Sequence, residues 1–340
     1  MKKISLKQFQ SIIFLLTITM FFGIGLSNIV RSCKESFWIS VILGILMGSI
    51  IVLMFSKIWF SSSTALFLEN NKFKNICYII IITFYTIVCL STLTNLIVSI
   101  YLTKLSPFII CLPLIFLMIY GSKDKEVLGR ISILLLILCL ILVSIIIVTV
   151  SFQIKIDNFL PLFNTKWQII LKEACNYAFY STSPLLLLSL YSPTEVNGIK
   201  KYSIVKTYFV ASVLILVAFL LTVGVMGTDL VNLYRYPEYI VLKRVSVFNF
   251  INNIENITAF FWIMIYIVFS LTTALSLKVT IQNLSNKKYL FPIYLFLILI
   301  LLHFTTFRRI TWLLFLYKYE AYLLLGCLIL FFLINIKKLK

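Results

Sequence analysis

The sequence has few charged residues: Asp, Glu, Lys and Arg together fill 12% of its 340 positions. A soluble globular domain carries about twice that share, because water must wet its surface. Hydrophobic residues fill 61% of the chain, and the mean hydropathy is +1.07. The composition therefore excludes an ordinary soluble domain and predicts a membrane protein.

Groups that hold metals or perform acid–base chemistry are also scarce. His303 is the single histidine, and the seven cysteines contain no CxxC pair. We therefore expect no metal site, no cofactor and no disulfide framework. The sequence has no GxSxG, Walker or HExxH motif either, so we do not expect an enzyme.

The formal net charge of +19 would suit a nucleic-acid partner. The thirty Lys and Arg residues, however, stand in small groups between apolar runs, with no basic face long enough to follow a phosphate backbone. Contacts with anionic lipid and topology signals beside membrane spans explain the charge better.

Apolar segments that could cross ~30 Å of hydrocarbon as helices recur along the chain. The first follows Lys2, Lys3 and Lys7 and extends to Val30, which is too long for a signal-peptide core. We expect one polytopic domain over residues 1–340. Ten spans are predicted at 11–30, 37–59, 76–100, 108–120, 131–152, 174–191, 202–226, 257–281, 289–304 and 322–336.

The distribution of positive charge predicts that both termini are cytoplasmic. With this orientation, eighteen Lys and Arg residues lie inside and twelve lie outside. Six of the twelve belong to the two long outer loops, 153–173 and 227–256, which report orientation poorly. The aromatic and amphipathic content of both loops predicts segments that lie at the membrane interface, including a helix within 230–250.

Two spans contain residues that disfavour a continuous helix. Gly23, Ile24 and Gly25 lie in the middle of the first span, and two glycines so close together invite unwinding. The sixth span contains the polar run Tyr180, Ser181, Thr182 and Ser183, followed by Pro184. These spans begin the two five-helix halves, and transporters with inverted repeats bind their substrates between such interrupted helices. Close helix packing at the glycines and a simple proline kink are the alternatives.

Polar stripes in two further spans would complete such a pocket. Thr92 and Asn95 share a face of the third span with Ser99, and Thr272 and Thr273 cluster in the eighth. For any one of these residues, a hydrogen bond between helices is the more common role. Glu173, Glu255 and Glu320 fall near predicted span ends, where interfacial hydration accounts for them, so no carboxylate is expected in the middle of a span.

Short motifs along the chain resemble the spore germination permeases, the B subunits of germinant receptors. The similarity rests on the following residues: Ile4, Ser5, Gln8, 22–26, Trp38, 121–130, 158–162, 250–255 and Trp262. Asn253 and Ile24 depart from the family pattern, which commonly has Arg and a small hydroxyl residue at these positions.

The resemblance places the chain in the amino acid–polyamine–organocation transporter superfamily and implies an all-α membrane protein. About ten transmembrane helices would form a LeuT-like five-plus-five inverted repeat, with helices 1 and 6 interrupted and repeats near 9–152 and 174–336. It also implies the inner spore membrane, an A-type membrane subunit and a C-type lipoprotein as partners, and a small germinant such as an amino acid as ligand.

Three functions are compatible with these observations. The first is a receptor subunit that binds a germinant at Gly23–Gly25, Thr92, Asn95, Tyr180–Thr182, Thr272 and Thr273. The second is a secondary amino-acid transporter with the same pocket. The third is a membrane glycosyltransferase or polymerase, with Asp229, Arg235, Glu238, Lys243 and Arg244 as its outer-loop candidates.

Overall fold

The computed structural model describes residues 4–21, 26–62, 64–68, 71–102, 104–161, 163–200, 202–234, 236–244, 254–285, 287–304 and 310–338. These residues are almost entirely helical. Within them, β-structure is confined to one isolated parallel bridge between Ile4 and Val196. The prediction of an almost entirely helical protein is therefore confirmed.

The helices follow one another along the whole chain. They are α1 (Leu6–Thr19), α2 (Leu26–Cys33), α3 (Phe37–Phe60), α4 (Lys72–Ile100), α5 (Pro107–Gly121), α6 (Lys125–Ser151), α7 (Trp167–Thr182), α8 (Ser203–Leu233), α9 (Pro237–Arg244), α10 (Ile254–Leu284), α11 (Leu290–Leu302) and α12 (Ile310–Ile334). Short 3₁₀ helices include η4 (Ile156–Phe159) and η5 (Ser183–Leu190). Each of the ten predicted apolar segments coincides with one or two of these elements.

Helix ends carry local sequence signals. Ser5 and Gln8 form a capping box at the start of α1, each side chain accepting a backbone N–H of the other residue. Asn71 caps α4 by accepting the N–H groups of Phe73 and Lys74. Gly227 has φ 75°, so the long regular part of α8 ends at Met226, which is where the seventh predicted span ends.

Five helical stretches are long and apolar enough to cross a membrane: Ser27–Phe60, Lys72–Ile100, Lys125–Ser151, Ser203–Leu233 and Ala259–Leu284. The first of these includes α2 and α3, between which Lys34 has φ 48° and the chain turns. Shorter apolar helices are Leu6–Thr19, Pro107–Gly121, Leu290–Leu302 and Tyr319–Ile334. Such a set of apolar helices is the architecture of a helical membrane protein.

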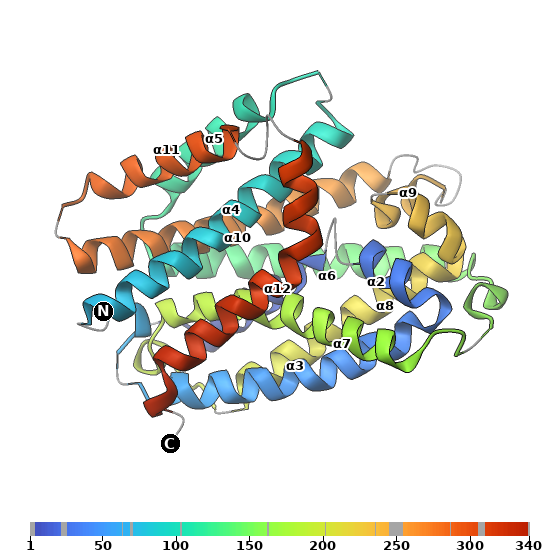
Figure 1. The fold of residues 1–340 in the computed structure, drawn as a ribbon, viewed down its shortest axis with the longest axis horizontal. Coiled ribbons are helices and arrows are strands. Elements are labelled where there is room, and N and C mark those ends of the chain that lie inside the picture. The colour runs from blue at the N-terminus through green and yellow to red at the C-terminus, as the bar shows by residue number, and fades with distance from the viewer. Residues whose placement is uncertain are drawn as a thin grey trace.

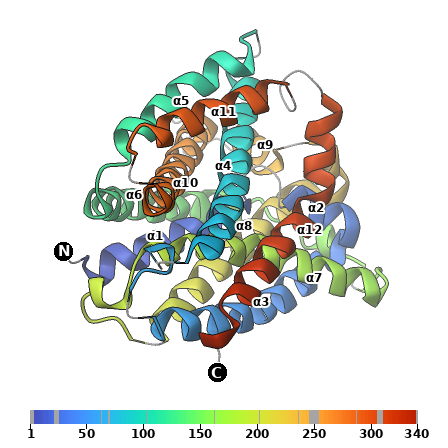
Figure 2. The same ribbon diagram turned by 60° about the vertical axis from the view of Figure 1, so that its left-hand side comes forward.

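The helices form an elongated bundle (Figures 1 and 2). Helix α10 packs against α4 in the middle, α3 packs against α7 and α8, and α5 packs against α11. The start of α1 and the end of α12 lie at the same end of the bundle, and α9 lies at the opposite end (Figure 1). Helix α6 is on the outside and exposes Leu134, Ile137, Ile141 and Val148, as a lipid-facing helix would.

The two long connections contain short helices. Helix α9 lies within 230–250, where an interfacial helix is predicted, and η4 lies in the other connection. Asn158 lies within η4 and donates from Nδ2 to the carbonyl of Gly224 at 2.7 Å. This hydrogen bond holds the connection against α8.

Helix α12 extends beyond the last predicted span at its start. It begins at Ile310, twelve residues before the predicted 322, and Glu320 lies near its middle. Lys318 and Glu320 interrupt the apolar run, so hydropathy starts the predicted span within the helix. The side chain of Glu320 is only 4% exposed.

Candidate ligand-binding site

The first predicted span consists of two helical pieces. Helix α1 ends at Thr19, and α2 begins at Leu26. Gly23, Ile24 and Gly25 fall between them, outside the described residues. Phe21 directly follows α1, and its ring lies 4.7 Å from that of Tyr177 and 5.8 Å from that of Phe219, centroid to centroid. These ring contacts fix the end of α1 against α7 and α8.

The sixth predicted span changes helix type at the polar run. Helix α7 ends at Thr182, and the chain continues without a break as the 3₁₀ helix η5, Ser183–Leu190. Pro184 has no N–H to donate, which disfavours further α-helical bonding. Runs of 3₁₀ helix longer than three or four residues are uncommon and often mark a functional hinge.

The polar side chains at the end of α7 point in different directions, because successive residues of a helix are about 100° apart. Ser181 Oγ lies 2.8 Å from the hydroxyl of Tyr208 on α8. Thr182 Oγ1 donates to the carbonyl of Ala178 at 2.7 Å, and its methyl group lies near Gly48 of α3. Tyr180 faces another way, toward α2. Ser181 and Thr182 thus contact α8 and α3 rather than sharing a pocket with Tyr180.

The stripes on α4 and α10 are brought together, because these two helices pack along each other. Thr92, Thr272 and Thr273 are buried, and Asn95 is half-buried. Thr272 Oγ1 donates to the carbonyl of Val268 at 2.7 Å, and Thr273 Oγ1 donates to that of Ser270 at 2.8 Å. Their oxygens keep the capacity to accept a hydrogen bond.

Three buried hydroxyls of α4 and η5 have no hydrogen-bond partner among the described residues: Tyr85, Thr92 and Ser183. Tyr85 and Thr92 are seven residues apart and share one face of α4. The Tyr85 hydroxyl faces Ser183, although the pair does not form a hydrogen bond of normal geometry. An unsatisfied buried hydroxyl costs about 1–3 kcal/mol, so these groups favour a site that binds a polar molecule.

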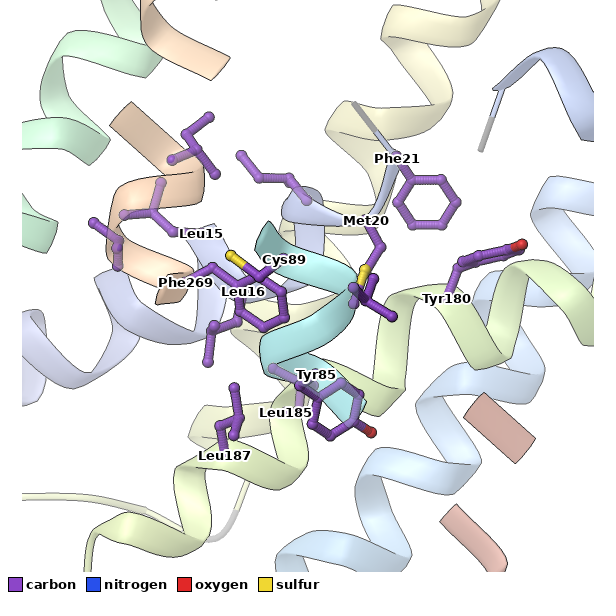
Figure 3. Packing of buried hydrophobic residues seen from close by; sticks show 14 of the residues in the cluster. Leu15, Leu16, Met20, Phe21, Tyr85, Cys89, Tyr180, Leu185, Leu187 and Phe269 are labelled. Atoms are coloured by element: carbon purple, nitrogen blue, oxygen red, sulfur yellow. The ribbon is translucent and has the colours of Figure 1, made fainter. Parts of the chain in front are cut away.

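An apolar cluster packs around Tyr85 (Figure 3). Leu15 and Leu16 of α1 pack with Leu185 of η5, Cys89 of α4 and Phe269 of α10. Tyr85 and Ser183 were not among the predicted site residues, since a tyrosine in an apolar run and the last serine of a polar run give no sign of the direction of their side chains. The spacing of Tyr85 from Thr92 is the signal that could have identified the tyrosine.

A polar cavity of about 180 Å³ opens between α2, α7 and α12. Its lining includes the following residues: Asn28, Arg31, Ser32, Lys172, Glu173, Asn176, Tyr180, Ala321 and Tyr322. Tyr180 is the one predicted site residue in this lining. Its hydroxyl points away from the apolar cluster (Figure 3), toward Asn28.

Two buried carboxylates act electrostatically on the Tyr180 hydroxyl. Glu173 is 5% exposed and accepts a hydrogen bond from Asn176 Nδ2 at 3.0 Å. Glu320 is 4% exposed, and its Oε2 has no hydrogen-bond partner in the described part of the chain. Both carboxylates contribute to the potential at Tyr180. Glu173 lines the cavity, whereas Glu320 lies outside its lining.

The opposite end of the bundle is held closed by an ion pair. Lys125 Nζ donates to both carboxylate oxygens of Glu195, at 2.9 and 3.1 Å. Glu195 also accepts the N–H of Ser192, and its carbonyl accepts the N–H of Ile4 at 2.8 Å. Trp59 Nε1 donates to the carbonyl of Tyr191 at 2.8 Å nearby. These contacts tie α1, α3 and α6 to the segment that follows η5.

Within the residues that the structure describes, no three His, Cys, Asp or Glu side chains gather in a way that could hold a metal ion. The arrangement is instead a bundle of apolar helices that encloses polar groups where two helices change character. That is the class of helical, permease-like membrane proteins.

The chain belongs to the spore germination permease family. The family model described as "Spore germination protein" matches residues 3–311, nearly the whole chain. Over 165 residues the chain is 25% identical to YfkT of Bacillus subtilis (strain 168), a protein named for spore germination. That alignment covers 48% of this chain and 44% of the relative, so the chain spans less than half of the length of YfkT. The family resemblance that the sequence motifs indicate is confirmed.

Proposed function

We propose that this protein is the permease-like subunit of a germinant receptor, which binds a small polar germinant within the membrane and signals the start of germination. Family membership makes it a germination-related, permease-like membrane protein. The family is transporter-like and non-enzymatic, in agreement with a sequence that has no catalytic motif. The proposal adds the inner spore membrane as its location, with cytoplasmic termini.

The helix contacts support a five-plus-five inverted repeat within one domain, 1–340. Taking α1 with α2 as the first span and α7 with η5 as the sixth, equivalent contacts occur in both halves. Helix α3 packs on α7 as α8 packs on α1, and α6 packs on α1 as α12 packs on α7. Helices α4 and α10, which would be equivalent, pack on each other. The repeats would run from about 9 to 152 and from about 174 to 336.

The observation that carries the proposal is the end of α1 at Thr19 and the change of α7 into a 3₁₀ helix at Ser183, together with buried, unpartnered hydroxyls. We assign the germinant to the space between the α1–α2 junction, α4, η5 and α10. Backbone amides at Gly23–Gly25 and the positive end of the α2 dipole would hold a carboxylate. Thr92, Thr272 and Thr273, with Tyr85 and Ser183, would accept or donate the remaining hydrogen bonds.

Binding would be reported to partner subunits as a shift between two conformations of the permease-like subunit. The partners we propose are an A-type membrane subunit and a C-type lipoprotein. Co-purification of both with this chain from solubilised spore membranes would test the assembly. Recovery of this chain without either protein would contradict it.

The ligand site is tested by the germination of spores that carry Thr92→Val or Gly25→Trp. Thr92→Val keeps the side-chain shape and removes the unpartnered hydroxyl, so the germinant concentration for half-maximal response should rise about tenfold, as for the loss of one good hydrogen bond. Ser99→Ala, an exposed hydroxyl on the same helix, is the matched control. A normal response of both test variants at normal protein level would remove the site.

One observation favours a second function, a secondary amino-acid transporter. Glu320 is a buried carboxylate near the middle of α12, and carboxylates at such positions commonly serve proton or ion coupling. Uptake of labelled amino acid into proteoliposomes that contain the purified chain alone distinguishes the two functions. Uptake above the level of empty liposomes would favour transport, and its absence would favour the receptor.

A further inference from the structure

The polar cavity between α2, α7 and α12 has an ordered charge distribution. Helix α7 runs inward from Trp167 to Thr182, so Lys172 lies near the outer end and Tyr180 lies two turns deeper. Glu173, Asn176 and Tyr180 follow the i, i+3, i+7 spacing and share one face of α7. The cavity thus changes from cationic at its rim to anionic in its depth.

The rim carries two cations. Arg31 and Lys172 are both exposed, and Arg31 Nη2 donates to the carbonyl of Asn232 at 3.3 Å, which holds the guanidinium beside the end of α8. A mobile anionic group that approaches this face would meet these positive charges first.

Glu173 lines the depth of the cavity, and Glu320 lies near Tyr180 outside the lining; the contacts of neither carboxylate include a cation in the described part of the chain. The polar contact of Glu173 is the neutral amide of Asn176, and Oε2 of Glu320 has none. Burial of an ionised carboxylate costs several kcal/mol unless a positive group or several donors compensate it. A cation that enters the cavity would supply that compensation.

The neutral polar groups suit an ammonium ion as the cation. An ammonium group donates three hydrogen bonds and needs acceptors on several sides. Glu173, the Tyr180 hydroxyl and the Asn28 amide oxygen are such acceptors in the lining, from α7 and α2. Glu320 of α12 lies outside the lining but acts electrostatically on Tyr180. The volume of about 180 Å³ holds a solute of a few heavy atoms.

We propose that this cavity is a binding site for the ammonium group of a small amine, distinct from the pocket at the α1–α2 junction. Glu173 pairs with the ammonium group, Tyr180 and Asn28 orient it, and Glu320 adds negative potential from outside the lining. For a zwitterion, Arg31 and Lys172 attract the carboxylate at the rim. This inference deepens the proposed function. It rests on that function because the proposed orientation gives solutes access to the cavity from the outer side.

The test is the binding of three probes to the purified full-length chain in detergent, measured by isothermal titration calorimetry. Glycine is the zwitterion, ethylamine the simple amine and acetate the simple acid. We expect glycine and ethylamine to bind, acetate not to bind, and Glu320→Gln and Glu173→Gln each to weaken the amines at least tenfold. Gln keeps the shape of Glu, and thermal unfolding without a probe verifies that each variant folds.

Asp157→Asn is the matched control, because it removes one negative charge from an exposed position in the outer connection. It should leave both amine affinities within twofold. Unchanged amine binding in Glu320→Gln and Glu173→Gln would overturn the inference, as would acetate binding as tightly as glycine. Glycine binding without ethylamine binding would also overturn it, because the ammonium group alone would then not be recognised.

This assay contains no spores and no partner subunits, so it is independent of the germination response. If amine binding depends on the two carboxylates while spores that lack the chain germinate normally, the cavity site stands and the proposed function fails. If the germination response depends on Thr92 while amine binding is unchanged in both carboxylate variants, the proposed function stands and the cavity site fails.

Discussion

Gly48 lies where α3 crosses the end of α7 and the side of α8. A Cβ atom at this position would overlap the Tyr208 hydroxyl and would lie 3.2 Å from the methyl carbon of Thr182. Tyr208 cannot move away freely, because its hydroxyl is bonded to Ser181 and its side chain is fully buried. Close packing of these three helices therefore requires glycine.

We expect Gly48→Ala to destabilise the protein by about 1–3 kcal/mol, the usual cost of overpacking. Tyr208→Phe in the same chain should restore part of the loss, since it removes the overlapping oxygen. The measurement is the apparent thermal midpoint in detergent. Gly326→Ala is the control, because nothing lies within 4 Å of its Cβ position, and it should be neutral or slightly stabilising. Equal midpoints for all variants would contradict the overlap.

Glu238 of α9 borders an apolar cavity between α6, α8 and α10, where its Oε2 is inaccessible and has no hydrogen-bond partner among the described residues. Burial raises the pKa of this carboxyl from its ordinary 4.5 to about 8. The folded state therefore holds the proton more tightly than the unfolded state. The resulting stabilisation is complete below pH 4.5 and is lost as the pH rises through about 8.

The expected result is a fall in the apparent thermal midpoint between pH 5 and pH 8.5, which Glu238→Gln should flatten because its amide does not titrate. Asp157→Asn provides the comparison, as an exposed acid whose removal should leave the pH dependence unchanged. A wild-type midpoint that rises over this interval would contradict the assignment.

The sequence predicted that three candidate site residues lie together at the end of one helix, but not the direction in which each side chain points. Tyr180, Ser181 and Thr182 were predicted together from one polar run, but a helix distributes them over three faces. Tyr180 reaches a cavity, whereas Ser181 and Thr182 meet Tyr208 and the neighbourhood of Gly48. Direction depends on which helix packs where, and a local polar run carries no information about that.

At the scale of elements, apolar runs locate helices well when glycine or proline ends them. Gly227 ends the long part of α8 at Met226, and its φ of 75° explains why the run stops there. For α12 the same method predicts only the second part of the helix, because Lys318 and Glu320 look like the end of a membrane segment. Only tertiary packing, which buries Glu320 beside α7, shows that the helix continues through them.

The ion pair between the start of α6 and the segment after η5 should contribute measurably to stability. The Glu195 side chain is 8% exposed, so Lys125→Met would leave a nearly buried carboxylate without its cation. We expect a loss of about 1–3 kcal/mol, between the values for exposed and buried pairs. Thermal unfolding in detergent provides the measurement.

The exposed pair of Arg130 and Glu126, one turn apart on α6, supplies the control for that variant. Arg130→Met removes the same charge and should cost at most about 0.5 kcal/mol. Equal losses for Lys125→Met and Arg130→Met would show that the Glu195 pair has no special role in closing this end of the bundle.

For the whole molecule, the proposed orientation places the end of α3 in the cytoplasm and η4 outside. Lys57 and Asp157 are exposed at these two ends. A membrane-impermeant thiol reagent should label Asp157→Cys in intact cells or protoplasts, and should label Lys57→Cys only after permeabilisation. Five of the seven native cysteines are buried, so labelling of the unmodified chain should be low and is subtracted as background. The reverse labelling pattern would invert the topology.

Composition and charge were sufficient to predict a helical membrane bundle, because lipid leaves a chain few alternatives. The polar cavity could not be predicted in this way. Its lining comes from α2, α7 and α12, which are far apart in the sequence, and none of its polar residues stands out from an ordinary span end.

The 3₁₀ helix η5 is longer than an α-helix with the same number of residues would be. Eight residues cover about 16 Å as a 3₁₀ helix but only about 12 Å as an α-helix, so rewinding η5 would draw its two ends about 4 Å closer together. One end is continuous with the helix that carries Tyr180, and the other leads to Tyr191 and the Glu195 ion pair. A change of η5 from 3₁₀ helix to α-helix would therefore alter the separation of Tyr180 from the Glu195 ion pair by more than the 2.9 Å between Lys125 Nζ and Glu195 Oε2.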